Sequence, residues 1–355
     1  MQQHAARAQK VESFGVASLV ERAIGTLDPS AAGLDDKGER SHATTADAAK
    51  KVISWGGHRR NLQASPTKCN AGGAMSNQKC RIAVVAPASR ISPQVADKVR
   101  ALAGSLYPDG RTEIFFHPQC FMSHGHFAGD DETRAQAFLD VANDDSYDAV
   151  WFARGGYGSC RIIEPVIYGL KEPSLRKTYL GYSDTGTLLA ALYSVGFEAV
   201  AHGPMAQDAV RDGGDAAIAR ALAWMVDRAP KTLEPTVSGS NKTAAFNITV
   251  LSQLLGTPLQ PDLDGHVLML EEVSEAMYRI DRSLFHITSN LEIKRVAGIM
   301  LGRCSDITAN QPDFGMDEEE VARYWCDQSG IPWLGRADIG HDAGNKIVPF
   351  GSSGR

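Results

Sequence analysis

The chain has 355 residues, of which 43% are hydrophobic and 22% are charged, and this ordinary composition excludes a wholly disordered or fibrous protein. The formal net charge of −6 lacks the basic excess of nucleic-acid-binding proteins, so no nucleic-acid partner is expected. No apolar run approaches the roughly 18–20 residues of a membrane-spanning helix, so no membrane partner is expected either.

The cysteines and histidines do not follow the spacing of a metal site. The cysteines stand at positions 69, 80, 120, 160, 304 and 326, without a CxxC pair or the spacing of a disulfide scaffold. Because the N-terminus also lacks the apolar core of a secretory signal, a cytoplasmic location is predicted. His124 and His126 have no third ligand at metal-like spacing, which favours a surface loop and no bound metal.

The first 78 residues differ in composition from the rest of the chain. Residues 1–78 are rich in Ala, Ser, Thr, Lys and Asp, and their apolar clusters are too short to form a core. One short amphipathic helix is consistent with the apolar spacing over residues 11–24. The segment is therefore predicted to be a poorly ordered extension.

From residue 79 onward, short apolar runs alternate with segments of helical periodicity, which predicts βα units and a parallel sheet. The predicted strands cover residues 81–86, 113–117, 148–153, 178–182 and 198–201. The predicted helices cover residues 93–106, 130–141 and 185–195. Residues 79–210 are accordingly predicted to form a Rossmann-like parallel-sheet domain.

A stretch with several prolines, glycines, serines and threonines, densest over residues 228–241, predicts a linker over residues 211–240. The segment after it, residues 241–355, is predicted to form a smaller C-terminal α/β domain. Its predicted strands cover residues 266–270 and 296–301, and its predicted helices cover residues 248–255, 276–288 and 317–326. The fold class is therefore α/β, with two domains.

A glycine cluster, Arg-Gly-Gly-Tyr-Gly over residues 154–158, follows the predicted strand 148–153. Ligands of open parallel sheets bind beyond the carboxyl ends of the strands, where this cluster lies. A dinucleotide-binding loop would need a third glycine where Arg161 stands. Half of an oxyanion hole and a plain tight turn remain as interpretations.

Ser183 also follows a predicted strand and precedes the predicted helix over residues 185–195. A sharp strand–serine–helix turn is the geometry of a nucleophile elbow, although Gly181 and Thr185 do not complete a GxSxG motif. The alternative is a serine that caps the helix N-terminus.

Acidic and histidine side chains later in the chain could complete a hydrolase site. Glu271 and Glu272 follow the strand 266–270, where alternation would turn one inward and one outward, or both could be solvated. His341 lies in a loop-like Gly-rich segment. Ser183, an acid and His341 in this order are a sensible serine-hydrolase set, in which histidine is the base and the carboxylate orients it.

Taken together, the motifs RGGYG (154–158), LGYSDTGTL (180–188), AHGPM (201–205), LEEVSEAMYRIDRSL (270–284) and GHDAGN (340–345) resemble those of the LD-carboxypeptidases. The stretches IAVVAPAS (82–89) and HFAGDDETRA (126–135) also fit, so the resemblance covers residues 80–350. Family members often carry Gly-Gly-Asn where this chain has Ala245, Phe246 and Asn247.

The resemblance implies a role for each matching residue. Ser183 matches the nucleophile, Glu271 the triad carboxylate and His341 the triad histidine. The oxyanion-hole donors are expected to be the backbone N–H groups of Gly156 and Asp184. Ser159, which follows the glycines, is a rival nucleophile that we expect to cap a helix instead.

The resemblance further implies a serine carboxypeptidase that hydrolyses an L,D-amide bond, releasing terminal D-alanine from a murein tetrapeptide in peptidoglycan recycling. It implies no cofactor, a murein peptide as substrate, and a homodimer. One alternative is an immunity-type serine peptidase that cleaves a microcin-like peptide–nucleotide conjugate. Another is a Rossmann-type protein that binds a ligand without catalysis.

Overall fold

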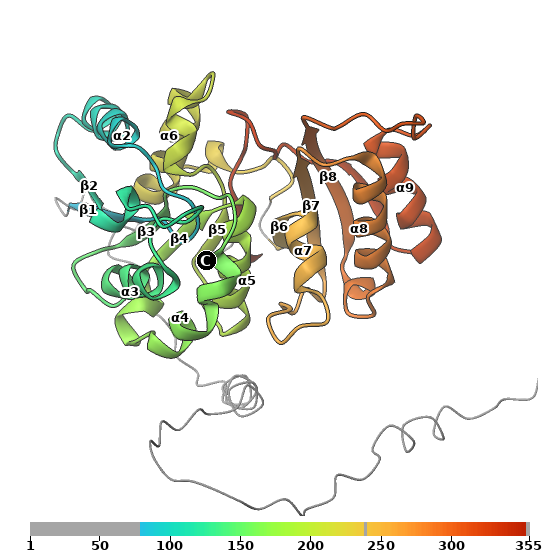
Figure 1. Cartoon of the computed structure of the whole chain (residues 1–355), viewed down its shortest axis with the longest axis horizontal. Helices are drawn as coiled ribbons and strands as arrows, with labels where there is room; N and C mark the ends of the chain where they lie inside the picture. Colours follow the sequence, from blue (N-terminus) through green and yellow to red (C-terminus); the bar gives the residue numbers. More distant parts are fainter. Residues whose placement is uncertain (1–78, 238–239, 353–355) are drawn as a thin grey trace, which may run out of the picture. The chain divides into compact units, whose positions relative to one another are not determined.

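The computed structural model describes residues 79–237 and 240–352, which belong to one unit of the chain (Figure 1). The predicted extension over residues 1–78 therefore lies outside the described residues. The described chain forms two mostly parallel sheets covered by helices, so the predicted α/β class is confirmed. In the described ranges, no helix combines the length and apolar character needed to cross a membrane.

The first sheet has six strands in the order β10-β5-β4-β3-β1-β2. All neighbours pair in parallel except β10, which runs antiparallel to β5. Most of these strands are continuous apolar runs because helices cover both faces of the sheet. The strands are β1 (Cys80–Val85), β2 (Thr112–Phe116), β3 (Ala149–Phe152), β4 (Thr178–Gly181), β5 (Val200–His202) and β10 (Val348–Pro349).

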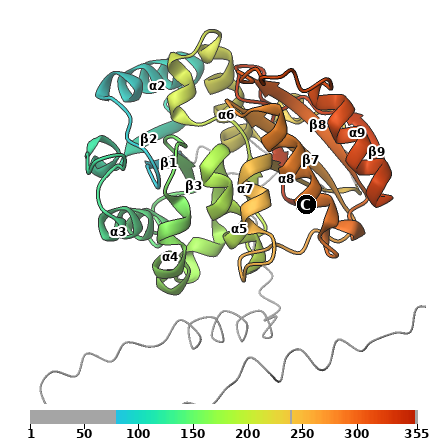
Figure 2. The same ribbon diagram turned by 45° about the vertical axis from the view of Figure 1, so that its right-hand side comes forward.

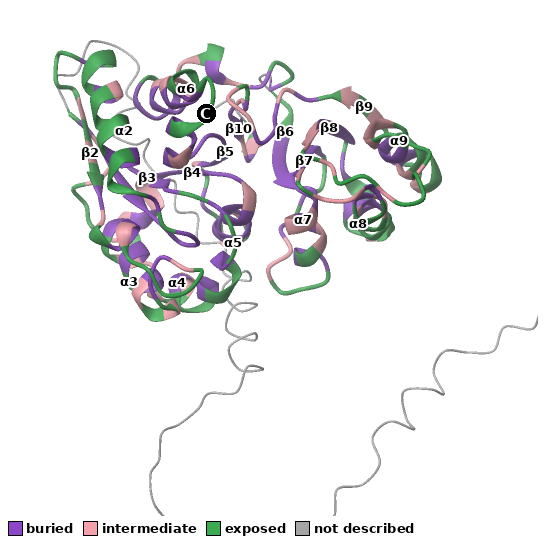
Figure 3. Ribbon diagram, turned by 45° about the horizontal axis from the view of Figure 1, so that its top comes forward, coloured by how far each residue is buried: buried purple, intermediate pink, exposed green. Residues whose placement is uncertain are grey.

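Successive strand residues point to opposite faces and so feed two separate cores. Val84 and Trp151 pack under helices α2 and α6, whereas Val85 and Phe152 pack under α3, α4 and α5. The helices of the first face are α2 (Pro93–Leu106) and α6 (Gly214–Asp227). Those of the second face are α3 (Asp131–Ala142), α4 (Ile163–Gly169) and α5 (Gly186–Ser194). Figure 3 shows the buried strands between helices whose outer sides are exposed.

Helix α6 corrects the predicted linker over residues 211–240. Residues 214–227 of this stretch are helical, and the short 3₁₀ helix Pro230–Thr232 follows. Ala217, Ile218, Ala221 and Leu222 recur at helical spacing and are fully buried against the first sheet. In the sequence, this helical spacing is followed by prolines and glycines that are typical of a linker.

The second sheet has five strands in the order β11-β6-β7-β8-β9. Helices α7, α8 and α9 cover one face, and α7 lies beside α5 of the first sheet (Figure 2). The strands are β6 (Lys242–Asn247), β7 (His266–Val273), β8 (Gly298–Ser305), β9 (Trp333–Arg336) and β11 (Gly351–Ser352). The helices are α7 (Ile248–Leu254), α8 (Met277–Ser289) and α9 (Glu318–Ser329). Strands β6, β9, β10 and β11 were not predicted.

The end of the described chain ties the two sheets together. Val348 of β10 pairs with His202 of β5, and three residues later Gly351 of β11 pairs with Thr243 of β6. The segment just before β10 contains His341, so its position is set from both sheets. The remaining short 3₁₀ helices are Pro118–Phe121, Ser159–Ile162, Glu172–Arg176, Ser183–Thr185, Ala206–Val210 and Ile293–Arg295.

Two glycine substitutions test the packing of α6. A Cβ at Gly214 would lie 2.2 Å from the backbone oxygen of Asp208, and backbone cannot move aside as a side chain can. We expect Gly214→Ala to lower the free energy of unfolding by about 1–3 kcal/mol.

The matched control is Gly104→Ala in α2, where no described atom outside the neighbouring backbone of the helix lies within 4 Å of the added Cβ. It should raise stability by about 0.5–1 kcal/mol, because alanine is the better helix former. Urea denaturation of both variants measures the difference. Equal midpoints would contradict the packing described for α6.

Candidate active site

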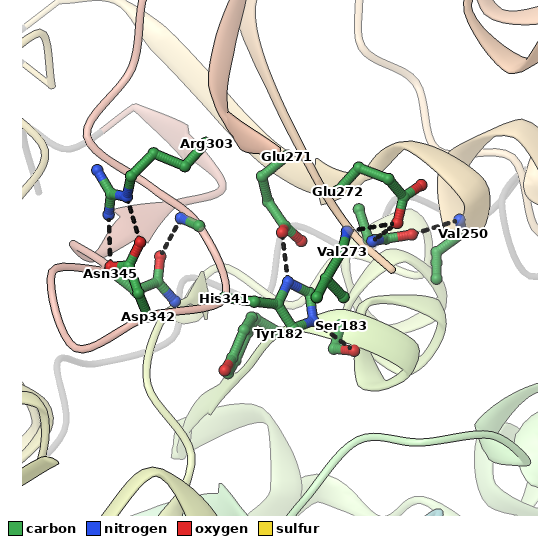
Figure 4. A network of polar contacts seen from close by, with 12 residues as sticks. Tyr182, Ser183, Val250, Glu271, Glu272, Val273, Arg303, His341, Asp342 and Asn345 are labelled. Atoms are coloured by element: carbon green, nitrogen blue, oxygen red, sulfur yellow. Dashed lines mark hydrogen bonds and ion pairs between the residues drawn. The ribbon is translucent and has the colours of Figure 1, made fainter. Parts of the chain in front are cut away.

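Ser183, His341 and Glu271 lie side by side and form a continuous chain of hydrogen bonds (Figure 4). The Nε2 of His341 lies 3.0 Å from the Oγ of Ser183. The Nδ1 of His341 lies 2.5 Å from the Oε2 of Glu271. The structure therefore brings together the three residues that the sequence separates by as many as 158 positions.

Ser183 stands on a sharp turn between strand β4 and helix α5. Its φ is 58°, which a non-glycine residue rarely adopts, and the 3₁₀ helix Ser183–Thr185 begins at this point. Tyr182 is the residue that precedes this helix, so Ser183 is not an N-cap. The capping interpretation is wrong because the hydroxyl group turns to His341 instead. The backbone has the geometry of a nucleophile elbow.

Glu271 and Glu272 are both buried inside β7, which extends three residues beyond the predicted strand. The interpretation of solvated strand-end carboxylates is therefore wrong. The register of β7 on β8 shifts between Leu270 and Glu272, and this irregularity accompanies the burial of two consecutive carboxylates. Glu271 faces His341, while Glu272 faces Asn247 and Thr249.

Glu272 is held by Asn247, the residue that this chain shares with the Gly-Gly-Asn motif, and by Thr249. The Nδ2 of Asn247 donates to Oε1 of Glu272 at 2.5 Å, and Thr249 donates to Oε2 through its N–H and its hydroxyl. Burial raises the pKa of Glu272 despite these hydrogen bonds. Asn247 also caps α7 by accepting the N–H of Val250. Asn247 therefore stabilises both Glu272 and the start of α7 next to the site.

The electrostatics of the site prepare His341 to accept a proton. Burial by itself would lower the pKa of His341, but the charge of Glu271 and its hydrogen bond outweigh burial and raise that pKa. Because the Glu271 carboxylate can only accept, Nδ1 carries the proton in the neutral ring, and Nε2 is free to take the Ser183 proton. The arrangement can generate a nucleophilic alkoxide without further groups.

Three arginines, two from the α6 region and one from β8, hold the loop that carries His341. Arg211 donates to the backbone oxygen of His341 at 2.5 Å, and Arg220 donates to the backbone oxygens of Ala343 and Asn345. Both arginines come from the region predicted as a linker. From β8 of the second sheet, Arg303 pairs with Asp338 and Asp342. Sequence reasoning missed these three arginines because they bind backbone atoms or loop residues far along the chain.

The glycine loop after β3 lies against the elbow. A Cβ at Gly155 would lie 3.0 Å from the Oγ of Ser183. Gly156 has a φ of 108°, and a Cβ there would lie 2.3 Å from the Oγ of Ser89. Only glycine therefore allows the loop backbone to pass this close to the nucleophile position. The loop predicted to supply an oxyanion-hole donor thus lies beside the hydroxyl of Ser183.

Asp184 fixes the glycine loop to the elbow. Its carboxylate accepts the N–H of Gly158 at 3.3 Å and the N–H of Ser159 at 2.9 Å. Ser159 is the first residue of the 3₁₀ helix Ser159–Ile162, with Gly158 before it, so the predicted cap is wrong. Within the described chain, the buried Oγ of Ser159 has no hydrogen-bond partner. Ser159 consequently lacks the base that a nucleophile needs.

His124 and His126 are exposed in a turn between β2 and α3, as the predicted surface loop requires. The Nε2 of His126 lies near the glycine loop, 3.7 Å from where a Gly156 Cβ would stand. Among the residues of known placement, no group of three or more His, Cys, Asp or Glu side chains could hold a metal ion. His126 is a neighbour of the site that sequence reasoning did not identify.

Comparison with known proteins places this architecture in a family. Residues 82–203 match the LD-carboxypeptidase N-terminal domain and residues 242–355 match the LD-carboxypeptidase C-terminal domain. A Synechocystis relative whose name describes a carboxypeptidase is 31% identical over 277 residues, covering 77% of this chain and 89% of the relative. The murein tetrapeptide carboxypeptidase of Pseudomonas aeruginosa is 26% identical over 296 residues, covering 77% of this chain and 92% of the relative.

Solved structures agree with the sequence matches. The muramoyltetrapeptide carboxypeptidase from Oxalobacter formigenes superimposes with a TM-score of 0.63 at 25% identity, covering 76% of this chain and 92% of that chain. The microcin C7 self immunity protein has a TM-score of 0.64 at 15% identity, covering 79% of this chain and 93% of that chain, which shows a shared fold. The chain therefore belongs to the LD-carboxypeptidase family and is a serine-type carboxypeptidase.

Proposed function

We propose that Ser183, His341 and Glu271 are the catalytic triad of an L,D-carboxypeptidase that releases terminal D-alanine from a murein tetrapeptide. The observation that supports this most strongly is the unbroken Glu271–His341–Ser183 hydrogen-bond chain on a nucleophile elbow. The names of the relatives from Pseudomonas aeruginosa and Oxalobacter formigenes supply the substrate class. Family membership makes the chain an enzyme, so non-catalytic ligand binding is no longer needed as an explanation.

The reaction follows from the position of each group. Ser183 Oγ attacks the carbonyl carbon of the L,D-amide while Nε2 of His341 takes its proton. The N–H groups of Gly156 and Asp184 are the proposed donors to the resulting oxyanion. His341 then gives the proton to the leaving D-alanine amine, which leaves an ester on Ser183. Water, activated by His341, hydrolyses this ester and restores the serine.

Side chains around the glycine loop bear on the choice of substrate. Arg154 is exposed beside Gly155, donates to the backbone oxygen of Arg90, and has no ion-pair partner in the described part of the chain. An unpaired guanidinium favours a substrate with carboxylates, such as a murein stem peptide. Tyr157 is 50% exposed near His126, which instead favours stacking on a nucleobase and supports the microcin-like conjugate as a second candidate.

Other parts of the proposal rest on the sequence alone. We keep the homodimer, the cytoplasmic location and domain limits at residues 79–210 and 241–355 as proposals, with the linker shortened by α6. Size-exclusion chromatography with light scattering tests the dimer.

The triad predicts a strong loss of activity on Ser183→Ala, on the order of 10⁴–10⁶ in turnover, because the nucleophile is removed. His341→Ala should cost a similar factor, and the double variant little more, since the residues act as a unit. Glu271→Gln should cost less, because the hydrogen bond can persist without the charge. Mass spectrometry of a murein tetrapeptide and of a microcin-type conjugate, each incubated with the enzyme, measures release of D-alanine or nucleotide.

Ser159→Ala is the matched serine control and should stay within about tenfold of the wild type, since its hydroxyl has no base. Circular dichroism confirms folding of each variant. Turnover by Ser183→Ala together with an inactive Ser159→Ala would assign the nucleophile to the glycine loop. Cleavage of the conjugate alone would replace the murein substrate with the second candidate.

The pH dependence of kcat/KM should reflect the raised pKa of His341. The imidazole acts as a base only when neutral, so kcat/KM should rise with pH through a midpoint above the ordinary histidine value of about 6.5. Glu271 and Glu272 favour the charged ring, and Arg211 opposes it. Glu271→Gln removes the largest favourable charge, so its midpoint should move to lower pH. An unchanged midpoint in this variant would show that Glu271 does not raise the pKa of the group that acts as the base.

Removal of metal ions should leave activity unchanged. The triad contains its own nucleophile and base, so the proposed reaction requires no metal-bound water. Turnover before and after dialysis against a chelator is the measurement. A loss that zinc restores would overturn the serine mechanism.

A further inference from the structure

We propose that His202 is a positioning residue, which through Asn345 fixes the loop carrying His341 to strand β5. The inference rests on the catalytic role proposed for His341. His202 and Asn345 both stand within motifs that support the family resemblance, yet the proposed mechanism uses neither. Each of the two residues is only 1% exposed.

One side-chain oxygen atom joins the two ends of the loop that carries His341. The Oδ1 of Asn345 lies 3.1 Å from the Nε2 of His202 and also accepts the N–H of Gly340 at 3.2 Å. Gly340 directly precedes His341, and Asn345 follows it by four residues. The two flanks of His341 are therefore joined at an atom that His202 holds.

The hydrogen-bond partners determine the protonation state of His202. A backbone N–H can only donate, so the Asn345 atom that it contacts must be the amide oxygen. The Nε2 of His202 must then donate to the same oxygen. Burial lowers the pKa of His202 to about 4, so the ring is neutral near pH 7 and carries its proton on Nε2. A neutral donor holds the loop without placing a second positive charge near His341.

Aromatic packing connects the loop to the nucleophile. The ring of Tyr182 lies 5.5 Å from the ring of His202 and 4.8 Å from the ring of His341. Tyr182 directly precedes Ser183 and is itself held by a hydrogen bond from its hydroxyl to Asp208 at 2.9 Å. The ring of Tyr182 is therefore fixed in position. A displacement of the His341 loop would change the distance from His341 to Ser183.

The backbone reinforces the same connection. Val348, which follows the loop, pairs with His202 across the antiparallel contact of β10 and β5. The loop is thus bound at His202 through both the backbone and the side chain. The other amide atom of Asn345, Nδ2, is buried and has no partner among the described residues, so the side chain is held through Oδ1 alone. Loss of the His202 donor would leave only Gly340 on that oxygen.

His266 provides a matched control for the loss of a buried histidine. It is 2% exposed, and its Nε2 lies 2.8 Å from the hydroxyl of Tyr193. It stands at the first residue of β7, whereas Glu271 lies five residues further along that strand. A variant of His266 loses a similar hydrogen bond, but it leaves the contacts of the His341 loop intact.

The experiment compares His202→Phe with His266→Phe. His202→Phe keeps a ring against Tyr182 but loses the donor, so we expect kcat to fall by about 10–100-fold with KM within about twofold. The midpoint of the kcat/KM profile should move to lower pH as the contact between His341 and Glu271 loosens. His202→Gln, which can still present an N–H to Asn345, should recover part of the loss. His266→Phe should change none of these quantities.

A second measurement does not depend on the natural substrate. A fluorophosphonate forms a phosphorus–oxygen bond with Ser183 and releases fluoride, while His341 takes the serine proton, so its labelling rate reports the Ser183–His341 pair. We expect His202→Phe and Asn345→Leu each to slow labelling, and the double variant to slow it little more than either. Mass spectrometry of the intact protein measures the rate.

The outcomes separate this inference from the proposed function. If His341→Ala abolishes labelling while His202→Phe matches His266→Phe, the positioning role is overturned and the triad stands. If His341→Ala labels normally, the triad itself is wrong. If His202→Phe does not fold, His202→Gln and Asn345→Leu test the inference in its place. Unchanged kcat and an unchanged labelling rate in both variants would overturn it.

Discussion

The hydrogen bond between His341 and the buried carboxylate of Glu271 is the interaction on which the site depends. Glu271 belongs to the second sheet, Ser183 follows a strand of the first, and His341 lies in a loop bound to both. A charge at 0% exposure is costly unless it is paired, so the fold must keep the imidazole within reach. The second oxygen of Glu271 has no partner in the described structure, which makes the contact with His341 its main compensation.

This constraint explains why so much of the surrounding structure serves a single loop. Arg211, just before α6, and Arg220, within α6, bind its backbone, and Arg303 of β8 binds its aspartates. The strands that follow it enter both sheets in turn. Several independent anchors of this kind fix the position of a loop side chain such as His341. The strained Ser183 backbone needs the same support, because its positive φ is stable only when neighbours enforce it.

The fold was largely predictable wherever hydrophobic periodicity was strong. The buried strands β1, β3 and β4 are short apolar runs in the sequence. Helix α2 shows the spacing of an amphipathic helix, and α9 begins with a capping box. Helix α6 was missed because the prolines and glycines after it resembled a linker. Strands β9 and β10 were missed because they are short, and pairing with a neighbour defines them more than their own residues do.

The sequence alone determined the residue types, the order of the motifs and the family resemblance, because these depend on local chemistry. It could not decide whether Ser183 capped a helix or faced a histidine, or whether Glu271 was solvated, since both depend on contacts between distant residues. Tertiary structure decided these points by bringing β4, β7 and the His341 loop together. It also assigned partners to His202, Asn345 and Arg211, whose hydrogen bonds span more than 100 residues and leave no periodic trace in the sequence.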